Sequence, residues 1–185
     1  AAAEIAGERG YESTSISAVC ERSGLPASSI YWHFKDKDEL IASVIDRSFS
    51  GWVQAWERGV RVPQSISREE AFRGEMKQIG RALTSFPDFL RLGLMLVLEH
   101  RPEEPTARRR FLEARRTTAV RIETFYRAFF TDLSAEDVGA LARITLALAD
   151  GFFVAREADG VDLAQAFDLM ASAILGAAGQ LSQRS

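Results

Sequence analysis

The sequence contains few of the residues that catalysis or metal binding would need. Among its 185 residues are one cysteine and two histidines, and all three lie far apart in the chain. One cysteine excludes a disulfide within the chain and a metal site built from cysteines. The glycines lack the spacing of a phosphate-binding loop, and no nucleophile has an evident base beside it. We therefore expect no catalytic residues, no metal site and no cofactor.

Long apolar runs and a strong net charge are also missing. The longest apolar run without a charge, LMASAILGAAGQL, is shorter than the roughly 18 residues that cross a bilayer. No cationic leader precedes an apolar run, so we expect a cytoplasmic protein without membrane contact. A net charge of −3 argues against nonspecific coating of nucleic acid. The chain opens on AAAEIAGERG, which resembles the middle of a helix, so we expect further residues upstream.

The patterns that are present predict helices. Apolar and charged contents of 46% and 26% are those of a globular protein. Strand-like alternation is scarce, whereas helix start signals recur at regular intervals. Capping residues are expected at Ser15, Asp36, Ser67, Ser134 and Asp162. We predict an all-α fold of about nine helices, with a small domain at residues 1–47 and a larger one at residues 48–185.

The first three expected helices form one unit. They run from the N-terminus to about residue 8, from residue 16 to 22, and from residue 26 to about 34. The spacing of their apolar residues predicts a shared core, made of Ile5, Ala6, Ile16, Val19, Leu25, Ile30 and Phe34.

The link SGLPAS joins the second and third helices as in a helix-turn-helix. In that arrangement the second helix of the pair places its N-terminal end in the major groove of DNA. Ala27, Ser28 and Ser29 occupy this end, and their short side chains allow a close approach to base edges. On spacing alone, a helical hairpin that touches no DNA is an equal alternative.

The segment TSISAVCERSGLPASSIYWHFKDKDELIASVI resembles the DNA-binding segment of the TetR family of bacterial transcriptional repressors. The matching features are the TSI start, the pairs AV and GL, the run SIYWHF and the start of the next helix at KDEL. The resemblance covers residues 1 to about 47 closely, and beyond them it extends only as a plan of helices. It implies a DNA-binding domain followed by a helical domain that binds a small molecule and dimerises.

The resemblance also implies which residues touch DNA. Contacts to phosphate, base edges or backbone are implied for Ser17, Ala27, Ser28, Ser29, Tyr31, Trp32, His33 and Lys37. Two of these residues keep a second interpretation. Trp32 could pack against the fourth helix, because large aromatic residues are commonly buried, and His33 could be an ordinary surface histidine. Cys20 is expected to be a small buried residue.

The large apolar residues between positions 48 and 130 could fill a solid core or line a cavity. The resemblance implies a cavity for a largely apolar effector, with candidate lining residues Trp52, Trp56, Phe89, Met95, Glu99, His100 and Phe125. For Glu99 and His100 a solvated helix end is the alternative. The arginine-rich segment at residues 108–121 is interpreted as a solvated face, with an anionic ligand or acidic partner as the alternative.

The last two expected helices, DVGALARITLALADGFFVA and DLAQAFDLMASAILGAAGQL, are apolar around most of their circumference. A helix that covers a core on one side needs only one apolar stripe. We therefore predict a homodimer, whose two-fold symmetry suits a palindromic operator in double-stranded DNA. The alternative is that both helices are central to the core of a monomer. The predicted interface residues are Leu163, Phe167, Met170, Ala173, Ile174 and Ala177.

Together these features predict a ligand-responsive, sequence-specific DNA-binding regulator, most simply a repressor that a small molecule releases from its operator. Two alternatives come from other classes. One is an all-helical enzyme with an acid/base site among the aromatic residues, which turnover by the purified protein would reveal. The other is a dimeric scaffold module that binds neither DNA nor a small ligand.

Overall fold

In the computed structural model, nine helices and no strands form within the described residues, which are 1–58, 66–99 and 105–183. This confirms the predicted all-α class. The helices are α1 (Ala2–Arg9), α2 (Ile16–Ser23), α3 (Ala27–His33), α4 (Lys37–Glu57), α5 (Arg68–Ser85), α6 (Asp88–Leu98), α7 (Thr106–Phe129), α8 (Ala135–Asp159) and α9 (Leu163–Ser182).

Side-chain caps explain where most of these helices begin. The hydroxyl of Ser15 accepts a hydrogen bond from the Ala18 amide at 3.1 Å, so α2 starts there. Ser67 and Glu70 exchange hydrogen bonds of 3.1 Å and 2.9 Å between side chain and backbone, which is a capping box at the start of α5. The remaining caps involve Asp36 before α4, Ser134 before α8 and Asp162 before α9.

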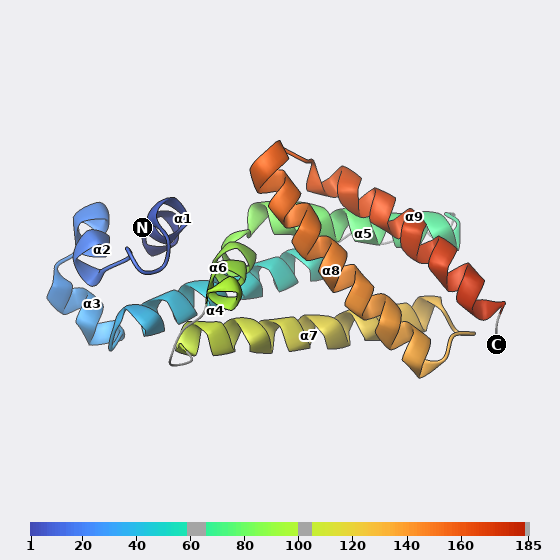
Figure 1. Ribbon diagram of the computed structural model, residues 1–185, viewed down its shortest axis with the longest axis horizontal. Helices are drawn as coiled ribbons and strands as arrows, with labels where there is room; N and C mark the ends of the chain where they lie inside the picture. Colours follow the sequence, from blue (N-terminus) through green and yellow to red (C-terminus); the bar gives the residue numbers. More distant parts are fainter. Residues whose placement is uncertain (59–65, 100–104, 184–185) are drawn as a thin grey trace. The chain divides into compact units, whose positions relative to one another are not determined.

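The chain packs into two units. The first comprises Ala1–Gly51 and Phe86–Arg115, and the second comprises Trp52–Ser85 and Arg116–Ser185. Both α4 and α7 begin in the first unit and end in the second, so the two units share two continuous helices (Figure 1).

In the first unit, α1 packs against both α2 and α6. Five of the seven predicted core residues of the first three helices are buried, namely Ile5, Ala6, Ile16, Val19 and Ile30. The prediction was wrong for Leu25, whose side chain is 53% exposed. This residue lies in the turn between α2 and α3, where no helical face directs it inward. Phe34 and Cys20 are half-buried.

In the second unit, α9 lies beside α5 and also packs against α8 (Figure 1). Gly80 permits the close approach of α5 and α9, because a Cβ atom there would lie 2.6 Å from the carbonyl oxygen of Leu163. The core contains Phe72, whose ring contacts four aromatic rings of the C-terminal part of α7 and the residue after it, Phe125, Tyr126, Phe129 and Phe130.

Tyr126 is the largest fully buried side chain of this core. Its hydroxyl lies 2.6 Å from that of Thr145, which in turn donates to the Leu141 carbonyl at 2.8 Å. Burial raises the pKa of the Tyr126 phenol far above its usual value, so the side chain stays neutral. The buried hydroxyl is thereby satisfied inside the bundle and acts as a structural group.

Candidate nucleic-acid interface

The turn between α2 and α3 has the geometry of a helix-turn-helix. Gly24 ends α2 in the left-handed conformation with φ of 71°, and its amide donates to the Cys20 carbonyl at 2.9 Å. A residue with a side chain adopts this conformation only with strain, which explains the glycine. Pro26 then precedes the first residue of α3 in an extended conformation. The sequence pattern SGLPAS therefore folds as predicted.

The side chains of α3 divide into one buried anchor and an exposed face. Ile30 is 5% exposed and fixes the helix on the domain core. Residues 27–29, at the N-terminal end of α3, are all exposed, as is His33. Tyr31 is 57% exposed and Trp32 is 82% exposed. The exposed face of α3 thus carries short side chains at its N-terminal end and aromatic side chains toward its C-terminal end.

Trp32 does not pack against α4, so the second interpretation of this residue does not hold. Its ring meets the imidazole of His33 edge-on, with the two ring centroids 4.6 Å apart. Ser17, in the first turn of α2, is exposed as well. The structure therefore leaves Ser17, Trp32 and His33 accessible to a partner outside the domain.

Lys37, for which the resemblance implies a phosphate contact, is engaged within the domain. Its ammonium donates to the carbonyl oxygens of Tyr11 at 3.2 Å and Glu12 at 3.1 Å. It also lies 3.5 Å from the Glu12 carboxylate and 4.6 Å from the centre of the Tyr11 ring. These contacts tie the start of α4 to the connection between α1 and α2.

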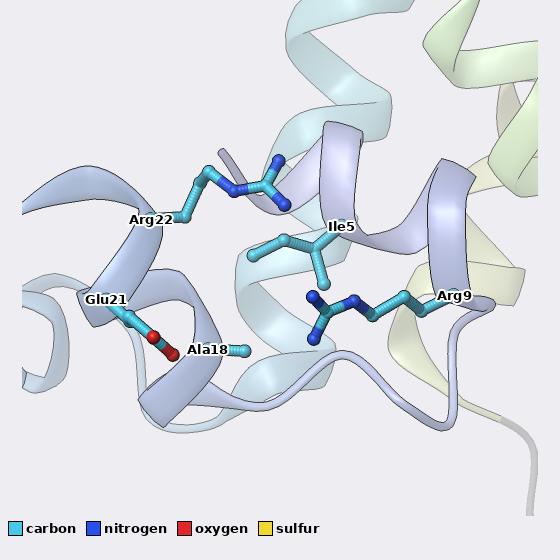
Figure 2. A pocket seen from close by; sticks show the side chains of 5 residues that line it. All are labelled: Ile5, Arg9, Ala18, Glu21 and Arg22. Carbon is cyan, nitrogen blue, oxygen red and sulfur yellow. The ribbon is translucent and has the colours of Figure 1, made fainter.

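A shallow groove of about 330 Å³ lies between α1 and α2. Figure 2 shows the guanidinium ends of Arg9 and Arg22 on either side of Ile5, with Ala18 and Glu21 on the facing helix. Arg22 is already paired, since it donates two hydrogen bonds of 2.9 Å and 3.1 Å to the Glu8 carboxylate. The hydrogen bonds and charge of Arg22 lower the pKa of Glu8. This ion pair holds α1 against α2.

The candidate effector residues are divided between the two units. In the first unit, Phe89 is buried with its ring 5.5 Å from that of Phe49, Met95 is half-buried and Glu99 is exposed. His100 lies outside the described residues.

In the second unit, the candidate aromatic residues take part in core packing. The buried rings of Trp52 and Trp56 lie 5.3 Å apart. The indole of Trp56 donates to Glu75 at 2.6 Å, and half-buried Phe125 stacks on Phe72. All three side chains therefore contribute to the packing of the second unit, Phe125 within the Phe72 cluster and the two tryptophans beside each other.

The predicted interface residues of α9 lie on two sides of the helix. Leu163, Phe167, Met170 and Ile174 are at most 2% exposed within the single chain, so they contribute to its own core and leave no area for a partner. Ala173 is exposed and Ala177 is half-buried. The prediction assigned these residues to one surface because both sides of α9 are apolar.

Apolar side chains do remain exposed on α8 and α9. Ile144 and Val154 of α8 are 50% and 53% exposed, and Leu169 of α9 is 68% exposed. By length and composition alone α8 could cross a membrane, and 33% of its most apolar window is buried. These two helices therefore present apolar surface on the side away from their core.

Sequence reasoning missed two residues at the base of α4. Asp38 and Tyr11 are joined by a hydrogen bond of 3.0 Å from the Tyr11 hydroxyl to the Asp38 carboxylate. The same carboxylate accepts hydrogen bonds from the amides of Thr106 and Ala107 in the first turn of α7. No local pattern reports contacts between residues 27 and 68 positions apart.

Comparisons with known proteins agree with this geometry. Residues 1–44 match the family described as bacterial regulatory proteins, tetR family. The fatty acid metabolism regulator protein of Bacillus subtilis (strain 168) is 25% identical over 61 residues, which is 33% of this chain and 31% of that protein. The matched segment thus spans about a third of the length of this relative.

Two solved structures share the fold over nearly the whole chain. The TetR family transcriptional regulator PfmR of Thermus thermophilus has a TM-score of 0.71 at 22% identity, with 94% of each chain covered. The fatty acid degradation regulator FadR of Bacillus halodurans has a TM-score of 0.72 at 13% identity, covering 94% of this chain and 90% of its own. The helix-turn-helix segment of this chain thus matches the tetR family of bacterial regulatory proteins, and the chain shares its fold with TetR family regulators along nearly its whole length.

Proposed function

We propose that this chain is a sequence-specific DNA-binding transcriptional regulator that acts as a homodimer and leaves its operator when a small molecule binds. In this proposal residues 1–47 bind DNA and residues 48–185 bind the effector and dimerise. The observation that carries the DNA-binding role is the exposed face of α3, where Trp32 is 82% exposed beside a buried Ile30. Clustered exposed aromatic residues on a soluble domain mark an interaction surface.

The proposed contacts follow from the position of each side chain. Residues 27–29 are short and exposed at the leading end of α3, which suits contact with base edges in the major groove. Ser17, Tyr31, Trp32 and His33 would contact the sugar-phosphate backbone beside that groove. We assign Lys37 to holding the connection between α1 and α2, because its ammonium already has acceptors there.

Selection from a random duplex library tests this role. The wild-type chain is expected to enrich a palindromic site, because two copies related by two-fold symmetry read two half-sites. Ser28→Glu would place a carboxylate at the proposed groove contact and should abolish enrichment. Thr117→Glu introduces the same charge on the exposed side of α7 and should leave the enrichment unchanged. Absence of any enriched site with the wild-type chain would refute the proposal.

For the effector we propose a small, largely apolar molecule that binds in the larger domain. Support comes from the many large apolar residues there and from two of the compared proteins, which are named for fatty acid metabolism and fatty acid degradation. Fatty acids and their derivatives are therefore the first class to test. Of the candidate lining residues, Trp52, Trp56 and Phe125 lie in the second unit and are the first to test.

A chain-length series of fatty acids provides the test. A ligand that binds only the folded state stabilises it by about 2.7 kcal/mol at a concentration 100 times its Kd. We expect a rise in melting temperature with a preferred chain length, together with release of the selected duplex. If the protein releases its DNA with none of these compounds, the proposed effector class is wrong, although DNA binding could still hold.

The proposed dimer uses the exposed apolar surface of α8 and α9. Ile144, Val154 and Leu169 supply apolar area, and exposed Ala173 and Gly176 allow close helix contact. Both helices thus have one apolar side in their own core and another that a second copy would cover. The proposed interface therefore consists of residues on the outer side of α8 and α9. It no longer includes four residues of the interface predicted from the sequence, namely Leu163, Phe167, Met170 and Ile174.

Sedimentation measures the oligomeric state directly. We expect a dimer for the wild-type chain and a monomer for Leu169→Glu, which places a charge in the proposed interface. Leu98→Glu is the matched control, because Leu98 is 81% exposed on α6, outside the proposed interface. A monomeric wild-type chain at tens of micromolar would exclude this dimer.

The mechanism we propose follows from the continuity of α4. This helix starts beside the recognition helix and ends in the second unit. A ligand that shifts α4 would change the separation of the two recognition helices, and half-sites about 34–36 Å apart tolerate little change. We propose no catalytic role and a cytoplasmic location, because the family that residues 1–44 match consists of bacterial regulatory proteins. An enzyme or a scaffold is not favoured.

A further inference from the structure

Three segments that are far apart in the sequence meet at the carboxylate of Asp38. The Tyr11 hydroxyl donates to one carboxylate oxygen at 3.0 Å, and the Ala107 amide donates to the same oxygen at 3.1 Å. The Thr106 amide donates to the other oxygen at 2.6 Å. Both Tyr11 and Ala107 are buried, with 4% and 0% exposure. Asp38 thus caps the first turn of α7 although it belongs to the first turn of α4.

The neighbouring Lys37 extends this junction to the helix-turn-helix. Its ammonium binds the carbonyl oxygens of Tyr11 and Glu12, which form the connection between α1 and α2. The Thr14 amide donates to the Tyr11 carbonyl at 3.1 Å, so the same connection leads directly into the cap of α2. Two consecutive side chains of α4 therefore hold the DNA-binding domain on one side and α7 on the other.

The position of the junction in the chain suits it to a regulatory role. Helices α4 and α7 are the two helices that continue from the first unit into the second. Asp38 lies in the first turn of α4, and its carboxylate caps the first turn of α7. A displacement along α7 would therefore reach the turn that holds Tyr11 through the Asp38 side chain in the first turn of α4, without a shift of the rest of α4.

We propose that Asp38 is a positioning residue that couples the N-terminal end of α7 to the helix-turn-helix, and that α7 is a second route, beside α4, by which the larger domain controls DNA binding. The control of DNA binding rests on the function proposed above, whereas the coupling itself does not. An aspartate suits this role because a carboxylate can accept several hydrogen bonds at once and complements the positive end of a helix.

Thr106→Pro tests the coupling from the α7 side without changing Asp38. Proline removes the amide that donates to Asp38, and it is well tolerated at the first residue of a helix. Thr106→Ala is the matched control, because it keeps the amide and loses only the hydroxyl. Hydrogen exchange of residues 10–15, far away in the sequence, reports whether the change reaches the helix-turn-helix.

We expect exchange in residues 10–15 to rise about tenfold in Thr106→Pro, as is typical when a charge-assisted hydrogen bond is lost. Thr106→Ala should match the wild type. If both variants exchange like the wild type in residues 10–15, Asp38 is only a local cap of α7 and the coupling is refuted.

Asp38→Asn approaches the same junction from its centre. It should speed exchange in residues 10–15 and in residues 105–110 together, because an amide group cannot accept from all three donors. Asp46→Asn is its control, since Asp46 also faces α7, through an exposed ion pair of 3.6 Å with Arg110, but lies eight positions further along α4. Faster exchange confined to residues 105–110 would contradict the proposal.

Binding of the selected duplex separates this proposal from the proposed function. Thr106→Pro should weaken binding about threefold, within the usual range for coupling residues. The salt dependence should not change, because no phosphate contact is removed. If the wild-type chain selects no DNA while exchange still rises in residues 10–15, the proposed function fails and the coupling stands. Unaltered affinity despite altered exchange would refute α7 as a route of control.

Discussion

Two substitutions in α3 should separate DNA binding from stability. Trp32 is 82% exposed, so it buries about a fifth of a side chain of up to ~250 Å², or ~45 Å². At ~25 cal/mol per Å², Trp32→Ala should lower the free energy of unfolding by about 1 kcal/mol at most. Ile30 is 5% exposed in the domain core, and Ile30→Ala should cost about 2–5 kcal/mol.

The loss of operator affinity should instead be larger for Trp32→Ala than for Ile30→Ala. Loss of an aromatic anchor at an interface costs about 2 kcal/mol, which corresponds to ~30-fold in Kd. We expect Trp32→Ala to bind the selected duplex ~30-fold more weakly while unfolding in urea almost as the wild type does. Ile30→Ala should lose binding only to the extent that it loses folded protein.

Urea unfolding followed by circular dichroism measures stability, and fluorescence anisotropy of the labelled duplex measures affinity. Two results would refute the reasoning. Unchanged affinity in Trp32→Ala would show that the exposed face of α3 does not meet DNA. A loss of more than about 2 kcal/mol in its unfolding free energy would show that Trp32 is packed within the protein.

Three further predictions concern the framework of the two units. Lys37→Met should weaken DNA binding without changing its salt slope, whereas a slope lower by about one would place Lys37 on a phosphate. Gly80→Ala should lower the melting temperature, with a cost of about 1–3 kcal/mol from the clash with the backbone of α9, while Gly74→Ala, with open space around it, should stabilise slightly. Because the hydrogen bonds from Arg22 lower the pKa of Glu8, the ion pair stabilises the fold above about pH 4.5 and loses this effect as the pH falls through the lowered value. Urea midpoints measured against pH should therefore fall less steeply in acid for Glu8→Gln than for the wild type, and equal slopes would contradict this.

The sequence determined those features that depend on contacts a few residues apart. The cap at Ser15, the capping box of Ser67 and Glu70, and the left-handed Gly24 all involve hydrogen bonds that span three or four positions, so their residue types alone reveal them. The helix-turn-helix and the exposed end of α3 could be predicted for the same reason. The all-α class followed from the recurrence of these signals.

Tertiary structure decided which of several equivalent apolar faces turns inward. Both sides of α9 are apolar, so its sequence could not show that Phe167 and Met170 are buried while Leu169 is exposed. Leu25 was wrongly placed in the core because a turn residue has no helical face to orient it.

The partners of charged side chains likewise required the folded chain. The ammonium of Lys37 finds its acceptors 25 and 26 positions away, and Asp38 caps a helix that begins 68 positions later. A carboxylate or an ammonium can satisfy its hydrogen bonds with any suitable donor or acceptor, including water, so its residue type does not specify a distant partner. Only the packing of α1, α4 and α7 brings these groups within hydrogen-bond distance.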